Sequence, residues 1–360
     1  MKKYIFFFAA AALSLAACSK NEVTPAFSDE NAEITFNVAP KTKALSASQS
    51  DFSHDNVFAS WAYYLPNDKT WAANRTDAND YIVNSTISYQ AANDSWKETG
   101  KSYYWPKGGK LTFFAYSLNK GDLTLNSDNL SHFTCYNDAT TYGINGLIDL
   151  DDNPNTDFLV AQVAADQSSN VKTYNHNGVP TLFKHRLSKV SVAVKKAADY
   201  ENVKFILNSV KFNKLSKSAH YAQYNDEDGD GVFNEYMKEG DIRTTQIYTA
   251  TDFEVASKDD FVAIPAANEV RYIYIPQNFK DQTDDAKIAT IEVNYTIETK
   301  VGSNIVSDVC TKTINVKDAF DSWEMGKKYV LDLTFSLDEI LWDPAVEEWE
   351  TGTTGTITIE

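Results

Sequence analysis

Cysteine and positive charge are both scarce in this chain of 360 residues. There are three cysteines, Cys18, Cys135 and Cys310, and the last two lie 175 residues apart. We therefore favour two unpaired, buried thiols over a disulfide between Cys135 and Cys310. Asp and Glu outnumber Lys and Arg by 50 to 33, which gives a net charge of −17. So acidic a chain will not bind nucleic acid or anionic lipid head groups by long-range attraction.

Catalytic signatures and helical periodicity are also missing. The five histidines are His54, His132, His176, His185 and His220, and no two have the i, i+4 spacing of a helical zinc site. There is no glycine-rich phosphate loop and no Gly-x-Ser-x-Gly elbow. Carboxylates are plentiful, but no spacing selects a glycosidase pair. We predict that the protein is not an enzyme and that His185, in a strand-like segment, is structural. Helix is expected at most in short pieces near residues 157–164 and 256–260.

The first eighteen residues have the layout of an export signal. Lys2 and Lys3 precede an apolar run, Tyr4 to Leu13, which is too short to span a bilayer as a permanent helix. Leu-Ala-Ala then leads directly to Cys18, which is the bacterial lipoprotein arrangement. We expect residues 1–17 to be a signal peptide and Cys18 to carry the lipid (palmitate), because a multiply acylated cysteine anchors a chain stably to a membrane. The alternative is a plain signal peptide with an incidental cysteine.

Alternation of apolar and polar residues dominates the rest of the chain. It occurs at Ile34-Phe36-Val38, Val190-Val192-Val194, Ile291-Val293-Tyr295-Ile297 and Tyr329-Leu331-Leu333-Phe335-Leu337. Period two marks half-buried strands whose apolar faces must meet a second sheet. About 340 residues remain after the signal, more than one ordinary core holds. The pattern predicts an all-β protein of two β-sandwich domains, 44–195 and 196–360.

One acidic loop is a candidate calcium site. Asp226, Asp228 and Asp230 alternate before Gly231, and Asn234 follows as a further ligand. Alternate carboxylates direct hard oxygens to a shared centre, and the glycine permits the sharp bend. The position of the bidentate glutamate of an EF-hand is Met237, however, so we expect weak calcium binding of another loop type. A solvated acidic turn without metal is the alternative.

Six segments in order carry a resemblance to a known family. They are Tyr103-Tyr104-Trp105-Pro106, Leu111-Thr112-Phe113-Phe114-Ala115-Tyr116, Asp157-Phe158-Leu159-Val160-Ala161, Phe183-Lys184-His185-Arg186-Leu187-Ser188, Tyr274-Ile275-Pro276-Gln277 and Trp323-Glu324-Met325-Gly326-Lys327-Lys328-Tyr329. Behind a lipoprotein signal, this order resembles the fimbrillin family of Bacteroidetes, the subunits of type V pili. The resemblance implies two transthyretin-like β-sandwich domains in tandem, a structural role in cell-surface fimbriae that supports adhesion, and other fimbrial subunits as partners. It also implies lipid anchoring in the cell outer membrane, with a host glycan or protein receptor as a further candidate partner.

The two ends of the chain fit that implied role. In the family, a trypsin-like protease cuts after a basic residue beyond the first strand, and that strand is lost. Here the segment 18–43 contains the isolated strand of Ile34, Phe36 and Val38, and we favour a cut between Lys43 and Ala44. The vacated groove then accepts a strand from another subunit by β-augmentation. A donor-like strand lies at 353–360, where Ile357 and Ile359 alternate with threonines; the alternative is that it pairs within its own domain.

Two other interpretations stay open. Family members that polymerise usually offer Arg at the cut, whereas this chain offers Lys41 and Lys43, so an uncut anchor subunit that keeps Cys18 is one alternative. A glycan-binding surface lipoprotein is the other, because aromatic faces suit apolar sugar faces. The candidate platform is Trp61, Tyr63, Tyr64 and Trp71, although alternating Trp61 and Tyr63 also fit a sandwich core.

Overall fold

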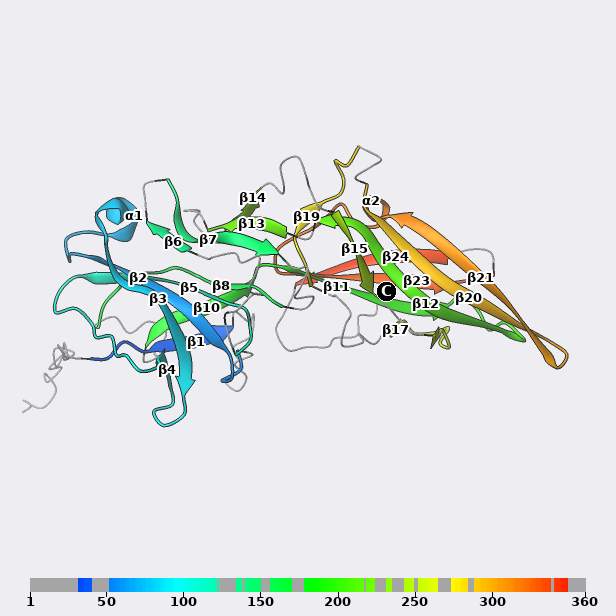
Figure 1. Ribbon diagram of the computed structural model, residues 1–360, viewed down its shortest axis with the longest axis horizontal. Helices are drawn as coiled ribbons and strands as arrows, with labels where there is room; N and C mark the ends of the chain where they lie inside the picture. The colour runs from blue at the N-terminus through cyan, green and yellow to red at the C-terminus, as the bar shows by residue number, and fades with distance from the viewer. Residues whose placement is uncertain are drawn as a thin grey trace, which may run out of the picture.

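The protein is described by a computed structural model. The residues that it describes are 32–40, 52–121, 123, 134–137, 140–149, 156–169, 178–216, 218–223, 231–234, 243–248, 252–264, 273–283, 288–337 and 340–348. Nearly all of the regular structure in these residues is β-strand, arranged in several sheets along an elongated molecule (Figure 1), which confirms the all-β class. None of the helices found in these ranges has the length or the apolar character needed to cross a membrane.

The first half is organised around an eight-stranded sheet. Its strands are β1 (Phe36–Pro40), β2 (Val57–Leu65), β3 (Asn79–Gln90), β4 (Ser95–Glu98), β5 (Lys110–Ser117), β8 (Leu159–Ala161), β9 (Ala164–Gln167) and β10 (Val179–His185). The order is β2-β3-β4-β1-β10-β8-β5-β9, and β2 also pairs with β5. That extra pairing closes all of these strands except β9 into a ring, with β1 as one of its members. Two short helices, α1 (Trp71–Asn74) and η1 (Arg75–Asp77), connect β2 to β3.

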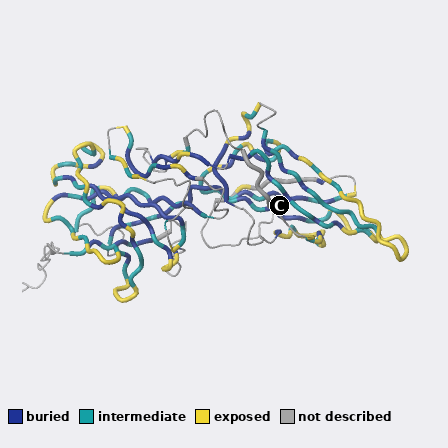
Figure 2. The backbone as a smooth tube through the Cα atoms, viewed as in Figure 1, coloured by how far each residue is buried: buried dark blue, intermediate teal, exposed yellow. Residues whose placement is uncertain are grey.

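A smaller sheet covers the outer face of β2 and β5. It contains β6 (Thr134–Asn137), β7 (Tyr142–Asp149), β13 (Ser218–Ala222) and β14 (Val232–Asn234). The apolar core between the two sheets includes Trp61, Phe114, Ile144 and Tyr221. The inner face of the ring encloses a separate core, to which β1 contributes. Figure 2 shows buried residues along the strands of the first half.

The second half is a pair of facing sheets. One holds β11 (Ser188–Lys196), β17 (Val262–Ala263), β18 (Ile273–Tyr274), β23 (Lys327–Phe335) and β24 (Ile340–Glu348). The other holds β12 (Val203–Ser216), β15 (Arg243–Tyr248), β16 (Phe253–Glu254), β20 (Thr290–Val301) and β21 (Asn304–Asn315). The remaining elements are β19 (Gln277–Asn278), which pairs with β22 (Ser322–Trp323), and α2 (Val316–Ala319). Alternating residues of β11, β12, β20 and β23 fill the core between the sheets, as period two predicts.

Strand pairing crosses the expected domain boundary at residue 195 in both directions. β11, which begins at Ser188, pairs in parallel with β23 of the second half over eight residues. β13, after the boundary, pairs with β7 of the first half. The described sheets therefore interleave near the middle of the chain, and the division into 44–195 and 196–360, each with a transthyretin-like fold, stays a prediction.

Three local expectations differ from the structure. Residues 157–164 contain β8 and the start of β9, and residues 256–260 are not helical. The apolar run at β8 arises because both faces of this strand are covered: Phe158 and Val160 pack in one core, and Leu159 packs in the other. Finally, β23 ends at Phe335, so Leu337 lies beyond the strand and is exposed.

Candidate functional site

β1 occupies a slot between two other strands of the first sheet. It runs parallel to β10, from Phe36 opposite Val179 to Pro40 opposite Phe183, and it meets β4 in antiparallel orientation at Phe36 and Trp96. The residues just before β1 are held as well, because the Ile34 N–H donates to the Tyr103 carbonyl at 2.7 Å. Backbone hydrogen bonds thus fix this short segment from both sides.

The inward side chains of this segment complete a core. Ile34, Phe36 and Val38 are only 3%, 4% and 8% exposed. The Phe36 ring meets the edges or faces of Phe58 and Phe113, with centroids 5.3 and 5.7 Å away. This places the displaced-strand residues expected from the sequence inside the ring of strands, where their burial stabilises the first half.

Gly178 allows β1 to come this close to β10. Its φ is +120°, a backbone conformation that side-chain-bearing residues rarely adopt. A Cβ atom there would lie 3.0 Å from the Phe36 carbonyl carbon and 3.0 Å from the Thr35 carbonyl oxygen. The Val179 N–H also donates to that Thr35 oxygen at 2.8 Å. A larger residue would therefore push directly on the β1 backbone.

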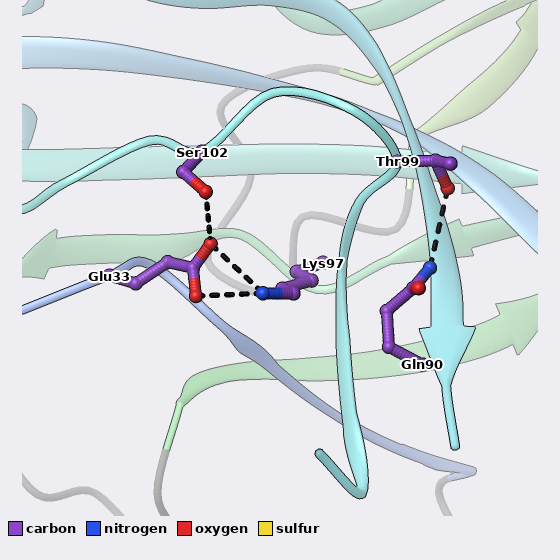
Figure 3. Close-up of polar contacts among 5 residues, drawn as sticks. All are labelled: Glu33, Gln90, Lys97, Thr99 and Ser102. Atoms are coloured by element: carbon purple, nitrogen blue, oxygen red, sulfur yellow. Dashed lines mark hydrogen bonds and ion pairs between the residues drawn. The ribbon is translucent and has the colours of Figure 1, made fainter. Parts of the chain in front are cut away.

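A polar cluster holds the N-terminal end of the segment (Figure 3). Lys97 Nζ lies 2.9 and 3.1 Å from the two carboxylate oxygens of Glu33, and Ser102 Oγ donates to Oε1 of the same group. The Glu33 and Lys97 side chains are 28% and 21% exposed, so the pair is partly screened from water. The hydrogen bond from Ser102, followed by that from Lys97, holds the pKa of Glu33 below its usual value.

At the other end, β1 leads into the expected processing segment. Pro40 is opposite Phe183, and the Phe52 ring stacks on Phe183 with centroids 4.9 Å apart. Pro40 and Phe52, the described residues on either side of the segment 41–51, thus both adjoin Phe183. Lys43 and Ala44 belong to this segment and lie outside the described residues.

Other predicted site residues also lie outside the described residues. These are Cys18, Asp226, Asp228, Asp230, Ile357 and Ile359. Asn234 is described only as the last residue of β14, opposite His220. Across the described ranges, no group of three or more His, Cys, Asp or Glu side chains is placed to hold a metal ion. Calcium binding by the acidic loop stays a prediction.

The histidines and cysteines that the structure describes differ in exposure: His185 is buried, whereas His54 and His220 are exposed. His185 Nδ1 lies 2.7 Å from Asp157 Oδ2 in a buried pair at the end of β10. His54 stacks on Tyr89 with ring centroids 3.4 Å apart. Cys135 and Cys310 are both free, as the sequence favoured, although they are half-buried rather than buried.

Of the two interpretations of the aromatic cluster, the structure supports the sandwich core over the glycan platform. Trp61, Tyr63 and Trp71 are each 4% exposed and pack in the core between the first two sheets, and Tyr64 is half-buried. Trp61 stacks on Tyr116, and Trp71 packs against Phe114. Because these faces meet other rings, Trp61, Tyr63 and Trp71 do not offer a sugar-stacking surface.

The sequence did not identify Lys97, Ser102 and Gly178 as partners of the first strand. Lys97 and Ser102 follow Glu33 by 64 and 69 residues, so no local spacing connects them. Gly178 follows Asn177, and an Asn-Gly pair marks a turn, but it does not indicate which strand the glycine approaches. A second signal is Glu33 itself, an acidic residue immediately before an apolar alternation.

These features define an all-β protein of several sheets in which a short N-terminal strand completes a core. The chain belongs to the fimbrillin-like family, which it matches over residues 42–360. It is 21% identical to the fimbrium subunit Fim1C of Phocaeicola vulgatus over 374 aligned positions, covering 97% of each chain. The fold is similar to that of a fimbrial protein from Bacteroides vulgatus, with a TM-score of 0.66 and 18% identity over 89% of this chain and 100% of that one.

Proposed function

We propose that this protein is a structural subunit of a cell-surface fimbria, exported as a lipoprotein through Cys18 and assembled by protease-triggered strand exchange. Membership of the fimbrillin-like family and similarity to a fimbrium subunit support the fimbrial role. The observation that carries the assembly mechanism is the position of β1. The segment that contains β1 and the residues just before it supplies three buried side chains to a core that the remaining strands otherwise surround.

Cleavage after Lys43 would separate that strand from the rest of the chain. Loss of Ile34, Phe36 and Val38 removes about 4.5–9 kcal/mol of hydrophobic stabilisation, at roughly 1.5–3 kcal/mol for each side chain. The facing edges of β4 and β10 would then present unpaired backbone groups beside an apolar groove. Such a groove strongly favours pairing with another strand.

The proposed donor is the segment 353–360 of another subunit. Ile357 and Ile359 alternate with threonines, so one face of an extended strand is apolar. Backbone hydrogen bonds to β4 and β10 would provide affinity, and the two isoleucines would enter pockets vacated by β1. Each subunit would thus fill the groove of its neighbour, which yields a polymer of two-domain, transthyretin-like subunits.

The N terminus of the mature protein tests this mechanism. We expect mass spectrometry of sheared surface fractions to find chains that begin at Ala44. Lys43→Ala should abolish the ladder of assembled species and leave the far-ultraviolet circular dichroism unchanged. Lys41→Ala is the matched control and should assemble normally. Normal fimbriae from the Lys43→Ala variant would overturn the proposed cut.

The second candidate function is an uncut anchor subunit. The observation that favours it is the absence of arginine before Arg75, since a protease strict for the planar guanidinium discriminates against lysine. In that case the outer-membrane fraction should contain chains that begin at lipidated Cys18, and β1 should remain in its slot. The same mass-spectrometric measurement separates the two functions.

A further inference from the structure

Two of the three residues in the polar cluster at Glu33 would remain in the protein after the proposed cut releases the first strand. Glu33 belongs to the segment that the proposed cut removes, whereas Lys97 is in β4 and Ser102 is in the connection after it. Both donors would therefore remain at the end of the emptied groove without the carboxylate that they now bind. Lys101, whose ammonium group lies over the Tyr103 ring at 4.3 Å, adds a second positive charge nearby in the chain. The hydrogen bond to Tyr103, with a smaller contribution from the nearby Glu98 carboxylate, raises the pKa of the Lys101 ammonium group. Because Glu98 offsets the charge of Lys101, Lys97 and Ser102 are the two groups that favour an anion at this end of the groove.

The last residues of the chain repeat the pattern of the first strand in reverse order. From Glu33 onward the segment reads Glu-Ile-Thr-Phe-Asn, and from Glu360 backward the chain reads Glu-Ile-Thr-Ile-Thr. Both readings place an acidic residue first, with apolar residues at the second and fourth positions. The polar residue between them is threonine in both.

We propose that Lys97 and Ser102 form a carboxylate-binding site that sets the register and direction of the incoming strand. Glu360 of a second copy occupies the position of Glu33, and the donor strand runs opposite to β1. The inference rests on the proposed strand exchange and specifies how the exchange is aligned.

Side-chain positions favour this direction. With Glu360 at the Glu33 position, Ile359 takes the place of Ile34 and Ile357 takes the place of Phe36. Gly355 then lies at the position of Val38. If the donor ran in the same direction as β1 with Ile357 at the Ile34 position, Thr356 would face Lys97. Only the reversed strand fills both apolar positions and also supplies the carboxylate.

Backbone pairing is compatible with the reversal. β1 is parallel to β10 and antiparallel to β4. A donor strand that runs the other way would be antiparallel to β10 and parallel to β4. Both kinds of ladder satisfy the N–H and C=O groups of a strand, and antiparallel pairing is slightly more stable for each residue. The longer contact, along β10, would become the antiparallel one.

A charge reversal tests the proposal without weakening the uncut protein. The starting variant carries Glu33→Lys together with Lys97→Glu, so the ion pair is retained with opposite sign while β1 is present. Its melting temperature should match that of the unaltered chain. After proteolytic removal of the first strand, the groove of this variant presents a carboxylate at position 97 to a donor that carries Glu360. We expect ladder formation to slow about three- to tenfold, because an attractive charge pair is replaced by a repulsive one at this partly exposed position.

Two further variants decide the direction. Adding Glu360→Lys to the charge-reversed chain should restore the rate of ladder formation. Adding Thr356→Lys instead should not restore it, since residue 356 faces position 97 only if the donor runs in the same direction as β1. Rescue by Thr356→Lys, or failure of Glu360→Lys to rescue, would overturn the proposed direction.

The remaining outcomes separate this inference from the proposed function. If the unaltered chain forms no ladder after cleavage, strand exchange itself is refuted, and the proposed register of the donor strand is refuted as well. If the unaltered chain forms a ladder and the charge reversal leaves its rate unchanged, strand exchange stands and the carboxylate site is refuted. Ser102→Ala, which removes one donor without changing charge, should slow assembly by a smaller factor than the charge reversal.

Discussion

The two halves of the molecule complete their cores in different ways. In the second half, every residue of the described core lies between Val190 and Ile340, on strands of the two facing sheets and the segments that join them. In the first half, Ile34, Phe36 and Val38 come from a segment that precedes the expected cut. The second half therefore holds its core with its own strands, whereas the core of the first half depends on a strand that one cleavage would release.

Their sheet edges differ as well. Ring closure pairs both sides of β1, so the first sheet exposes no edge at that point. In the second half, β21 and β24 are outer strands of their sheets, and the hairpin of β20 and β21 projects at the end of the molecule far from β1 (Figure 1). Ile305 and Val309 on that hairpin are 65% and 71% exposed. Pro344 in β24 suits an outer strand because it donates no hydrogen bond. Among the described sheets, β9, β6 and β14 of the first half are also outer strands, but the edges of β4 and β10 beside β1 would become unpaired only on losing β1.

The largest expected effect on stability comes from removing a buried ring from the core that depends on β1. Phe36→Ala in the uncut chain should lower the free energy of unfolding by about 3–5 kcal/mol, because a buried ring is lost between Phe58 and Phe113. Urea denaturation measures the change. After cleavage and strand removal, the variant and the unaltered chain should be equally stable, since residue 36 has left both.

Phe335→Ala is the matched control in the second half. Phe335 is fully buried against Phe205 and Tyr295, so its loss should cost about 3–5 kcal/mol both before and after cleavage. A loss below about 1 kcal/mol for Phe36→Ala in the uncut chain would contradict the dependence of the first core on β1.

A smaller effect is expected at two glycines with positive φ. Gly178→Ala should destabilise the uncut chain by about 1–3 kcal/mol through backbone strain, with an added penalty from the close approach to Phe36 and Thr35. Faster amide exchange in β1 would report the displacement. Gly302 in the β20–β21 hairpin has φ +64° and open space around its Cβ position, so Gly302→Ala should cost only about 1–2 kcal/mol. Equal exchange rates in β1 for both variants would argue against a special role for Gly178.

The smallest expected effect on stability comes from the Glu33 carboxylate, whose ion pair with Lys97 holds the segment of β1. Because the folded-state pKa of Glu33 is lowered from 4.5, the carboxylate contributes stability above that value and loses it as pH falls through the lowered pKa. The contribution is about 0.2–1 kcal/mol, as for other partly exposed pairs. Glu33→Gln should narrow the difference between the unfolding free energies at about pH 6 and about pH 3 by that amount. An unchanged pH dependence would show that the pKa of Glu33 does not differ between the folded and unfolded states.

Much of the fold follows from local sequence. Alternation identified the strands that became β1, β11, β20 and β23, because burial of one sheet face imposes period two wherever it occurs. The same reasoning predicted that Ile34, Phe36 and Val38 face a core, and their low exposure confirms it. It failed at β8, where both faces are covered and the apolar residues run consecutively.

Local sequence patterns are enough to show that the chain is built of strands and that an isolated apolar strand lies close to a basic segment. The folded structure is needed to show that this strand closes a ring, that Glu33 contacts Lys97 from 64 residues away, and that Gly178 allows the close approach of Phe36. Burial patterns repeat along the chain and are visible locally. The register between distant strands depends on which surfaces meet, and no local spacing encodes that choice.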